Sequence, residues 1–243
     1  MPGGCPGAGI GAGDLIMGGV VRAFVGVAVT DVLLVVVLAV SHPGFWRQPG
    51  ALAYLVPVLV MLAVYAAGAV VVVVRPELTP LASLRAGGAA GLVLGGVEVV
   101  NIAVETFAGL SGTTNIAVTA PLILGSFLGW GWVAARQARR VATVRAGLTA
   151  AYAAATATML VGVTFGLVLV ALASGRVARG LVGDPDFARS GWTDVDDFAL
   201  ANTFDNAFTH LLGALVVATA VGSVGIALGL HLRSRSQAPR SGP

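Results

Sequence analysis

The stretch AGGAAGLVLGGVEVVNIAVETF, residues Ala86–Phe107, decides the fold class of this chain. It is long and apolar enough to cross a bilayer as a helix, since about 20 such residues span the hydrocarbon core. It also contains Glu98, Asn101 and Glu105, which fall within roughly 60° on one helical face at about 100° per residue. Because a carboxylate in hydrocarbon is costly, such residues face a protein interior or a water-filled cavity. The stretch therefore predicts a membrane helix whose polar face points into a helix bundle.

The composition of the whole chain indicates the same class. Of its 243 residues, 57% are hydrophobic and only 10% are charged, and its mean hydropathy is +0.92, whereas a soluble domain carries about 25% charged residues. All 14 basic residues are arginine, so lysine Schiff bases and a P-loop lysine are excluded. The single cysteine, Cys5, excludes an internal disulfide and a cysteine-based metal cluster. We predict no metal and no cofactor, and the net charge of +3 does not indicate nucleic-acid binding.

Six apolar windows are long enough to cross a membrane, and they predict an all-α bundle of six transmembrane helices within residues 23–232. The windows are Ala23–Val40, Ala51–Val74, Ala86–Phe107, Ile116–Ala135, Leu148–Leu172 and approximately Asn206–Leu230. Residues 1–22 are rich in glycine and residues 233–243 are basic and polar, so both terminal segments are predicted to be flexible. An acidic loop, about residues 174–205, is expected to join the last two spans.

The placement of arginine predicts the orientation, because short cytoplasmic loops hold an excess of basic residues. The arginines concentrate between spans two and three, between spans four and five, and after span six. They are Arg75, Arg85, Arg136, Arg139, Arg140, Arg145, Arg233, Arg235 and Arg240. Both termini are then cytoplasmic and the acidic loop lies outside. A lysine-free chain rich in alanine, glycine and valine is typical of a GC-rich bacterial gene, so we predict the plasma membrane of such a bacterium.

Other polar residues extend the predicted core. Asp31 lies near the middle of the first span, and no arginine lies deep in any span to neutralise it. Thr193-Asp194-Val195-Asp196 resembles a capping box with Thr193 as N-cap, and predicts a helix that starts near Asp194 and continues into span six. On that helix Asn202, Asn206 and His210 recur every four residues and share one face. We expect this second polar face near the outer surface.

These residues favour a transport-type protein whose polar core binds a proton, a cation or a small solute. The core would consist of Asp31, Glu98, Asn101, Glu105, Asn206 and His210. The alternative is a structural or regulatory membrane subunit, in which the acidic residues are neutral and hold helices together. Glycines spaced every four residues, such as Gly87, Gly91 and Gly95, allow helix backbones to approach closely. They predict a central place for span three, and they leave open a membrane-protein partner or a homo-oligomer within the lipid bilayer.

Two short motifs support a third interpretation. Gly109-Leu110-Ser111-Gly112 forms a G-x-S-G at the outer start of span four, and His210 lies near the outer end of span six. This pattern is similar to the rhomboid intramembrane proteases, in which a G-x-S-G serine on span four pairs with a histidine on span six. The resemblance implies Ser111 as nucleophile and His210 as its base. The second span lacks the histidine and asparagine that this family uses around its oxyanion site, and we expect no enzymatic activity apart from this resemblance.

Overall fold

The computed structural model describes residues 12–75, 79–109 and 112–237. Within these ranges the chain is helical, with seven α-helices and one short 3-10 helix, η1 at Phe45–Arg47. Six of the α-helices are long and apolar enough to cross a membrane by length and composition, which confirms the predicted membrane bundle; the side on which the termini lie stays a prediction. The α-helices are α1 Ala12–Ser41, α2 Ala51–Val74, α3 Leu81–Phe107, α4 Gly112–Val141, α5 Val144–Leu181, α6 Pro185–Ser190 and α7 Val195–Gln237.

Most of these helices extend beyond the apolar windows that predicted them. α1 begins at Ala12 rather than Ala23, and α5 continues to Leu181 rather than ending at Leu172. Hydropathy identifies only the apolar part of a helix, the part that can lie in the hydrocarbon core. The backbone hydrogen bonds continue into the polar residues beyond it, because extending an existing helix costs much less free energy than nucleating a new one. The expected loop at residues 174–205 is consequently mostly helical: it contains the end of α5, all of α6 and the first turns of α7.

The predicted helix that continues into span six is confirmed as α7, but its N-cap differs from the expected Thr193. The Asp194 carboxylate accepts hydrogen bonds from the backbone N–H groups of Asp196, at 2.8 Å, and Asp197, at 3.2 Å. A cap reaches the N–H groups two and three residues ahead, and Thr193 lies one residue too early to do so. Asp184 caps α6 in the same way through the backbone N–H of Asp186.

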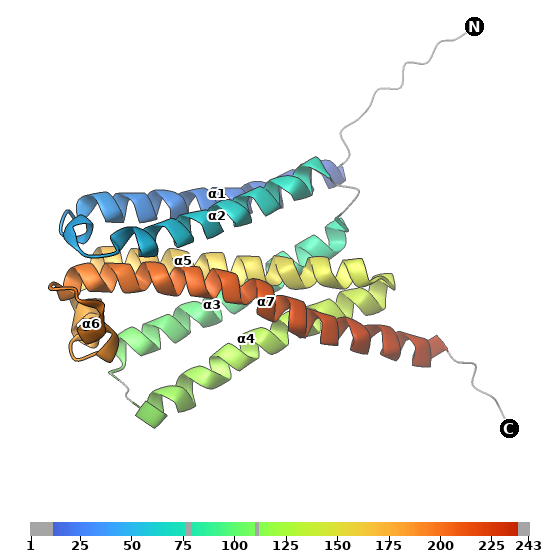
Figure 1. Ribbon diagram of the computed structural model, residues 1–243. Coiled ribbons are helices and arrows are strands. Elements are labelled where there is room, and N and C mark those ends of the chain that lie inside the picture. The colour runs from blue at the N-terminus through green and yellow to red at the C-terminus, as the bar shows by residue number, and fades with distance from the viewer. Residues whose placement is uncertain (1–11, 76–78, 110–111, 238–243) are drawn as a thin grey trace, which may run out of the picture.

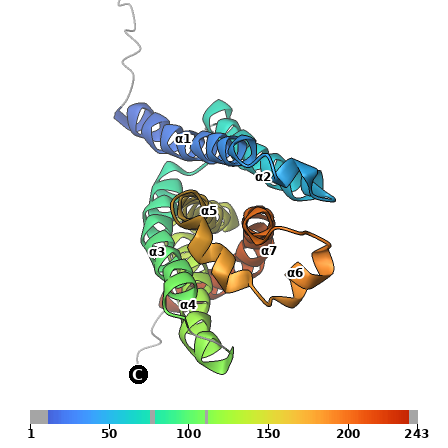
Figure 2. The same ribbon diagram turned by 90° about the vertical axis from the view of Figure 1, so that its left-hand side faces the viewer.

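α5, rather than the expected α3, is the central helix, and it packs against α1, α3, α4 and α7. The α1/α2 hairpin lies on one side of α5 and α7, and α3 and α4 lie on the other (Figures 1 and 2). The glycine ridge of α3 explains its close approach to α5: a Cβ at Gly87 would meet the carbonyl oxygen of Ala150, and one at Gly91 would meet that of Ala154. These glycines therefore serve packing within the chain.

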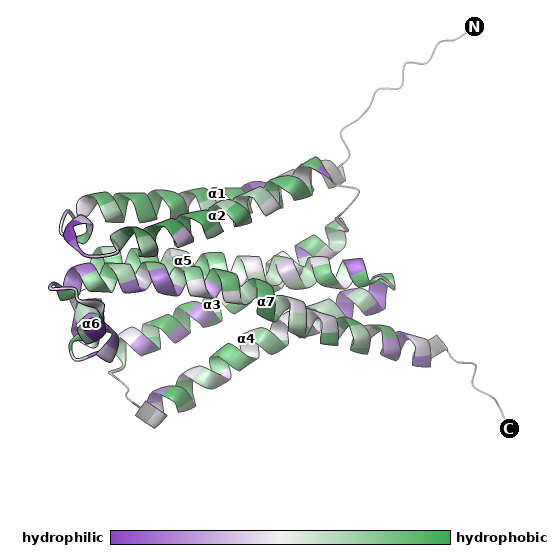
Figure 3. Cartoon of the chain, in the orientation of Figure 1, coloured by the Kyte–Doolittle hydropathy of each residue, from purple (hydrophilic) through white to green (hydrophobic). Residues whose placement is uncertain are grey.

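The two ends of the bundle differ in charge. The start of α1 and the end of α7 lie at the same end of the bundle, and α6 lies at the other (Figure 1). The connections between the helices are therefore divided between these two ends. We call the end that holds Arg75, Arg145 and Arg233 the basic end, and the end that holds α6 and the start of α7 the acidic end. Hydrophobic residues dominate the helices between them, and hydrophilic ones gather at α6 (Figure 3).

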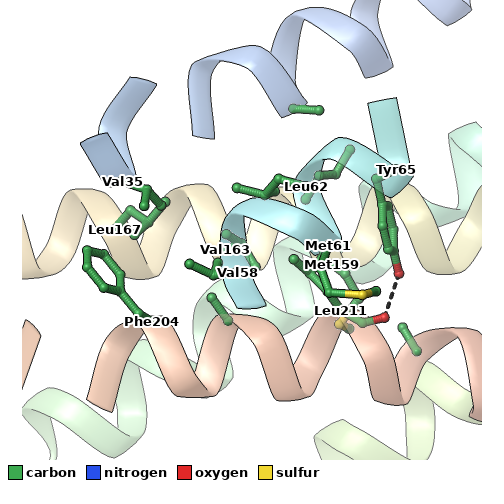
Figure 4. Packing of buried hydrophobic residues seen from close by; sticks show 14 of the residues in the cluster. Val35, Val58, Met61, Leu62, Tyr65, Met159, Val163, Leu167, Phe204 and Leu211 are labelled. Carbon is green, nitrogen blue, oxygen red and sulfur yellow. Dashed lines mark hydrogen bonds between the residues drawn. The ribbon is translucent and has the colours of Figure 1, made fainter. Parts of the chain in front are cut away.

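The hydrophobic core lies between the α1/α2 hairpin and the α5/α7 pair. Its labelled members come from all four helices (Figure 4): Val35, Val58, Met61, Leu62, Tyr65, Met159, Val163, Leu167, Phe204 and Leu211. The Tyr65 hydroxyl donates a hydrogen bond of 2.8 Å to the carbonyl oxygen of Leu211, which satisfies the one polar group that this ring brings into the core.

Candidate functional site

A pocket of about 320 Å³ lies between α3, α5 and α7 in the half of the bundle near the acidic end. α3 contributes Glu98 and Glu105, which are seven residues apart and hence on one face. α7 contributes its own polar face to the same pocket, with Asn202, Asn206 and His210. Two faces that helical periodicity predicted separately therefore line one cavity.

α5 makes room for this cavity through its glycines. A Cβ placed on Gly162 would lie 2.9 Å from Cγ of Glu98, so the Glu98 side chain lies directly over Gly162. One turn further along, Gly166 also lines the pocket, and a Cβ there would meet no atom within 4 Å. The small residues of α5 therefore hold the carboxylate close to the helix and leave the volume beside it empty.

α5 is kinked beside the pocket, and residues on both sides of the kink line it. Ala173 has non-helical backbone angles, with φ −137° and ψ 33°, and Ser174 and Gly175 follow it, a type of sequence at which helices bend. Beyond the kink, the Arg176 guanidinium donates hydrogen bonds to the carbonyl oxygens of Thr106, at 3.3 Å, and Phe107, at 3.1 Å. These carbonyls at the end of α3 have no partner within their helix, and a cation is favourable there.

Glu98 is the most unusual residue of the pocket. Its side chain is only 6% exposed, and it lies about 14 Å along α3 from Phe107 at 1.5 Å per residue, well inside the apolar span. The side chain of Asn101 is its hydrogen-bond partner, while the side-chain oxygen of Asn101, Oδ1, is buried without a partner among the described residues. Glu98 forms no ion pair within the part of the chain that the structure describes. Burial of an unpaired charge is costly, so a neutralised form of this carboxyl group is favoured here.

The tautomer of His210 follows from its one backbone contact. Its Nδ1 lies 2.7 Å from the carbonyl oxygen of Asn206, and because a carbonyl only accepts, Nδ1 carries the hydrogen. The other ring nitrogen, Nε2, is therefore the hydrogen-bond acceptor of the neutral ring. The ring lines the pocket and interacts electrostatically with both Glu98 and Glu105.

The structure does not bring Asp31 into this group. Asp31 is fully buried, and its Oδ1 lies 2.6 Å from the hydroxyl oxygen of Thr164 on α5, within hydrogen-bond distance. Thr164 is two residues from Gly162, so the two positions point about 200° apart around the helix. Asp31 and Glu98 thus flank α5 on opposite sides. Of the six predicted core residues, four line the pocket, namely Glu98, Glu105, Asn206 and His210. Asn101 does not line it, and Asp31 lies apart with Thr164.

Sequence reasoning did not identify Arg176, Gly162 or Thr164 as parts of these sites. Thr164 was detectable as a polar residue inside an apolar span, whereas Arg176 and Gly162 act through contacts with another helix that no local pattern reveals. Ser111, the nucleophile that the rhomboid resemblance implies, lies outside the described residues. Among the residues that are described, no three His, Cys, Asp or Glu side chains lie close enough to hold a metal ion.

Comparison with known proteins found no match to this chain among family models, curated proteins or solved structures.

Proposed function

We propose that this chain is a transport-type membrane protein in which the pocket between α3, α5 and α7 binds a small cation in exchange for a proton. The observation that carries the proposal is the position of Glu98, which is buried deep in an apolar span and yet lines a cavity. Ionisable residues at such positions mark ion and substrate pathways in membrane proteins. A bound cation and a proton are the two ways to neutralise it, and exchanging one for the other is a coupled transport step.

The charges around the pocket favour a cation over an anion. Glu98 and Glu105 both line it, and neither carboxylate has an ion-pair partner within the described residues. Arg176 also lines it, but its guanidinium is hydrogen-bonded to the carbonyl oxygens at the end of α3. The amide side chains of Asn202 and Asn206 add neutral oxygen ligands of the kind that coordinate cations.

The contrast with Asp31 argues against a purely structural role for Glu98. Asp31 is held by Thr164 in a fully buried position that no described cavity reaches, as expected of an acid that only joins helices. Glu98 faces open volume of about 320 Å³. A structural acid would cost less free energy if that volume were filled, because a cavity leaves its lining without packing partners.

The experiment is proton-coupled cation flux in liposomes that contain the purified protein and a trapped pH-sensitive dye. Sodium, potassium and ethylammonium salts are added outside in turn, and uptake of a cation in exchange for a proton raises the internal pH. We expect one of these cations to drive the change in wild type and Glu98→Gln to reduce it to the level of empty liposomes, because the amide cannot release a proton.

A matched pair of glycine variants separates the pocket from general damage. Gly166→Leu places its side chain into the open volume of the pocket, whereas Gly96→Leu adds the same side chain to an exposed site on α3 where a Cβ also meets nothing within 4 Å. We expect Gly166→Leu to block flux and Gly96→Leu to retain it. Undiminished flux in Glu98→Gln, or no flux in wild type with any of the three cations, would overturn the proposal.

A further inference from the structure

The two carboxylates of the pocket lie at different depths. Glu98 and Glu105 both line it from α3, and their positions are about 10 Å apart along the helix axis at 1.5 Å per residue. α3 runs toward the acidic end (Figure 1), so Glu105 lies nearer that end and Glu98 lies deeper. Glu105 is exposed, whereas Glu98 is buried. The pocket therefore has one carboxylate at an inner level and one at an outer level.

α7 adds neutral hydrogen-bond acceptors along the same length. It runs away from the acidic end (Figure 1), so Asn202 lies toward the outer level of the pocket and His210 toward the inner level. Asn202 carries an amide oxygen, and His210 has Nε2 as the acceptor of its neutral ring. Both residues line the pocket. A carboxylate combined with neutral acceptors suits a primary ammonium group, which has three N–H donors and no acceptor.

The wall between the two levels is apolar. Ile102 lies between the two acids on the same face of α3, four residues after Glu98 and three before Glu105. Val163 and Leu169 of α5 line the pocket as well. A hard metal ion needs several oxygen ligands close together, and among the described residues no three His, Cys, Asp or Glu side chains provide such a group. The middle of the pocket therefore suits hydrocarbon rather than a metal ion.

The size of the pocket also favours an extended ligand. Its volume of about 320 Å³ equals that of about ten water molecules, since each occupies about 30 Å³ in the liquid. A single dehydrated metal ion would leave most of this space empty. A short chain of carbon and nitrogen atoms would occupy it while its two ends lie at the two carboxylates.

We propose that the cation bound in this pocket is an alkyl diammonium, with one ammonium group at Glu98, the other at Glu105 and the methylene chain against Ile102. The assignment rests on the proposed cation exchange and specifies its substrate class. A chain of about four carbons fits, because each nitrogen lies about 2.8 Å from its carboxylate oxygen, between the two acids. The outer ion pair contributes less than the inner one, because Glu105 is exposed and exposed ion pairs are weak.

The test is isothermal titration calorimetry of the detergent-purified protein at low ionic strength and about pH 8, where primary ammonium groups keep their protons. Three ligands share a four-carbon chain: the terminal diamine, butylamine, and the amino acid with its ammonium and carboxylate groups at opposite ends. We expect the diamine to bind about fivefold more tightly than butylamine, the gain of one partly exposed ion pair. The amino acid should bind more weakly than butylamine, because its carboxylate would lie at Glu105.

A matched pair of charge variants tests the outer level. Glu105→Gln keeps the shape of the side chain but removes its charge, and should lower the affinity for the diamine to that for butylamine. Asp205→Asn removes a charge from an exposed residue of α7 that does not line the pocket, and should keep the fivefold preference. The assignment is overturned by equal binding of diamine and butylamine to wild type, by a preference that survives Glu105→Gln, or by tighter binding of the amino acid than of the diamine.

The binding experiment does not require transport, so its failure is distinguishable from failure of the proposed function. Coupled flux of sodium or potassium in liposomes, together with no preference for the diamine, would support the exchange and overturn the diammonium assignment. Diamine binding that depends on Glu105, together with no flux of any cation, would support the ligand and overturn transport.

Discussion

The carboxyl group of Asp31 on α1 and the hydroxyl of Thr164 on α5 lie 2.6 Å apart inside the bundle. The same hydroxyl lies 2.7 Å from the carbonyl oxygen of Leu160, and a hydroxyl has only one hydrogen to donate. If Asp31 itself carries a hydrogen, it donates to Thr164 and Thr164 donates to Leu160, which satisfies both contacts. The second carboxyl oxygen of Asp31 is buried without a partner among the described residues, and a neutral acid tolerates this better than a carboxylate does.

We therefore expect Asp31→Asn to fold with nearly unchanged stability, because an amide can also donate to Thr164. Thr164→Val should lower the free energy of unfolding by about 1–3 kcal/mol, since it leaves the Asp31 carboxyl group buried without its partner. Thermal unfolding in detergent measures both changes. Infrared spectroscopy at neutral pH should show a protonated carboxyl band that Asp31→Asn removes; a loss of stability in Asp31→Asn as large as in Thr164→Val would contradict the neutral pair.

The contact of α3 with α5 depends on Gly91, where a Cβ would meet the carbonyl oxygen of Ala154 and would lie 2.6 Å from its neighbour Cβ in Ala157. Gly91→Ala should therefore destabilise the bundle by about 1–3 kcal/mol, the usual cost of overpacking. Gly96→Ala, on the same helix but in open space, is the control and should leave the unfolding temperature unchanged or slightly raise it. Equal unfolding temperatures for the two variants would mean that α3 can move away from α5 at little cost.

Arg176 should hold the kinked end of α5 against the end of α3. Arg176→Ala removes two hydrogen bonds to the carbonyl oxygens of Thr106 and Phe107 and exposes those carbonyls, at a cost of about 1 kcal/mol. We expect faster amide hydrogen exchange in residues 174–181 than in wild type, while exchange in the part of α5 before the kink stays unchanged. Faster exchange along the whole of α5 would show that Arg176 supports the bundle globally rather than this end.

Phe45, Trp192 and Phe204 form an aromatic cluster at the acidic end of the bundle. The Phe45 side chain is fully buried. The centroid of its ring lies 5.7 Å from the ring centroid of Trp192 and 5.8 Å from that of Phe204, both in edge-to-face geometry. Phe45→Ala should cost about 3–5 kcal/mol of unfolding free energy, as buried aromatic truncations do. Trp46→Ala, at a side chain that is 46% exposed, should cost clearly less. Thermal unfolding of the two variants measures the difference. Equal unfolding temperatures would show that the acidic end is not a packed core.

The spans and their polar faces could be read from the sequence because hydropathy and helical periodicity are local properties. Glu98 and Glu105 share a face of α3, and Asn206 and His210 share a face of α7, whatever else the chain does. Local pattern was less informative at helix ends: the N-cap of α7 is Asp194 rather than Thr193, and helices continue past their apolar windows. Such boundaries depend on hydrogen bonds whose geometry a hydropathy pattern does not contain.

The sequence by itself determined that this protein is an all-α membrane bundle with acidic residues inside it, since charge in hydrocarbon and the length of a span are sufficient for that conclusion. Only the tertiary structure decided which faces meet. Glu98 lies opposite the polar face of α7 and Asp31 lies with Thr164 on the other side of α5, because close packing of glycine on alanine, as at Gly91, sets how the helices are arranged around α5. The neighbours of a helix depend on the fit of whole surfaces, and that fit is a property of the assembled bundle rather than of any one segment.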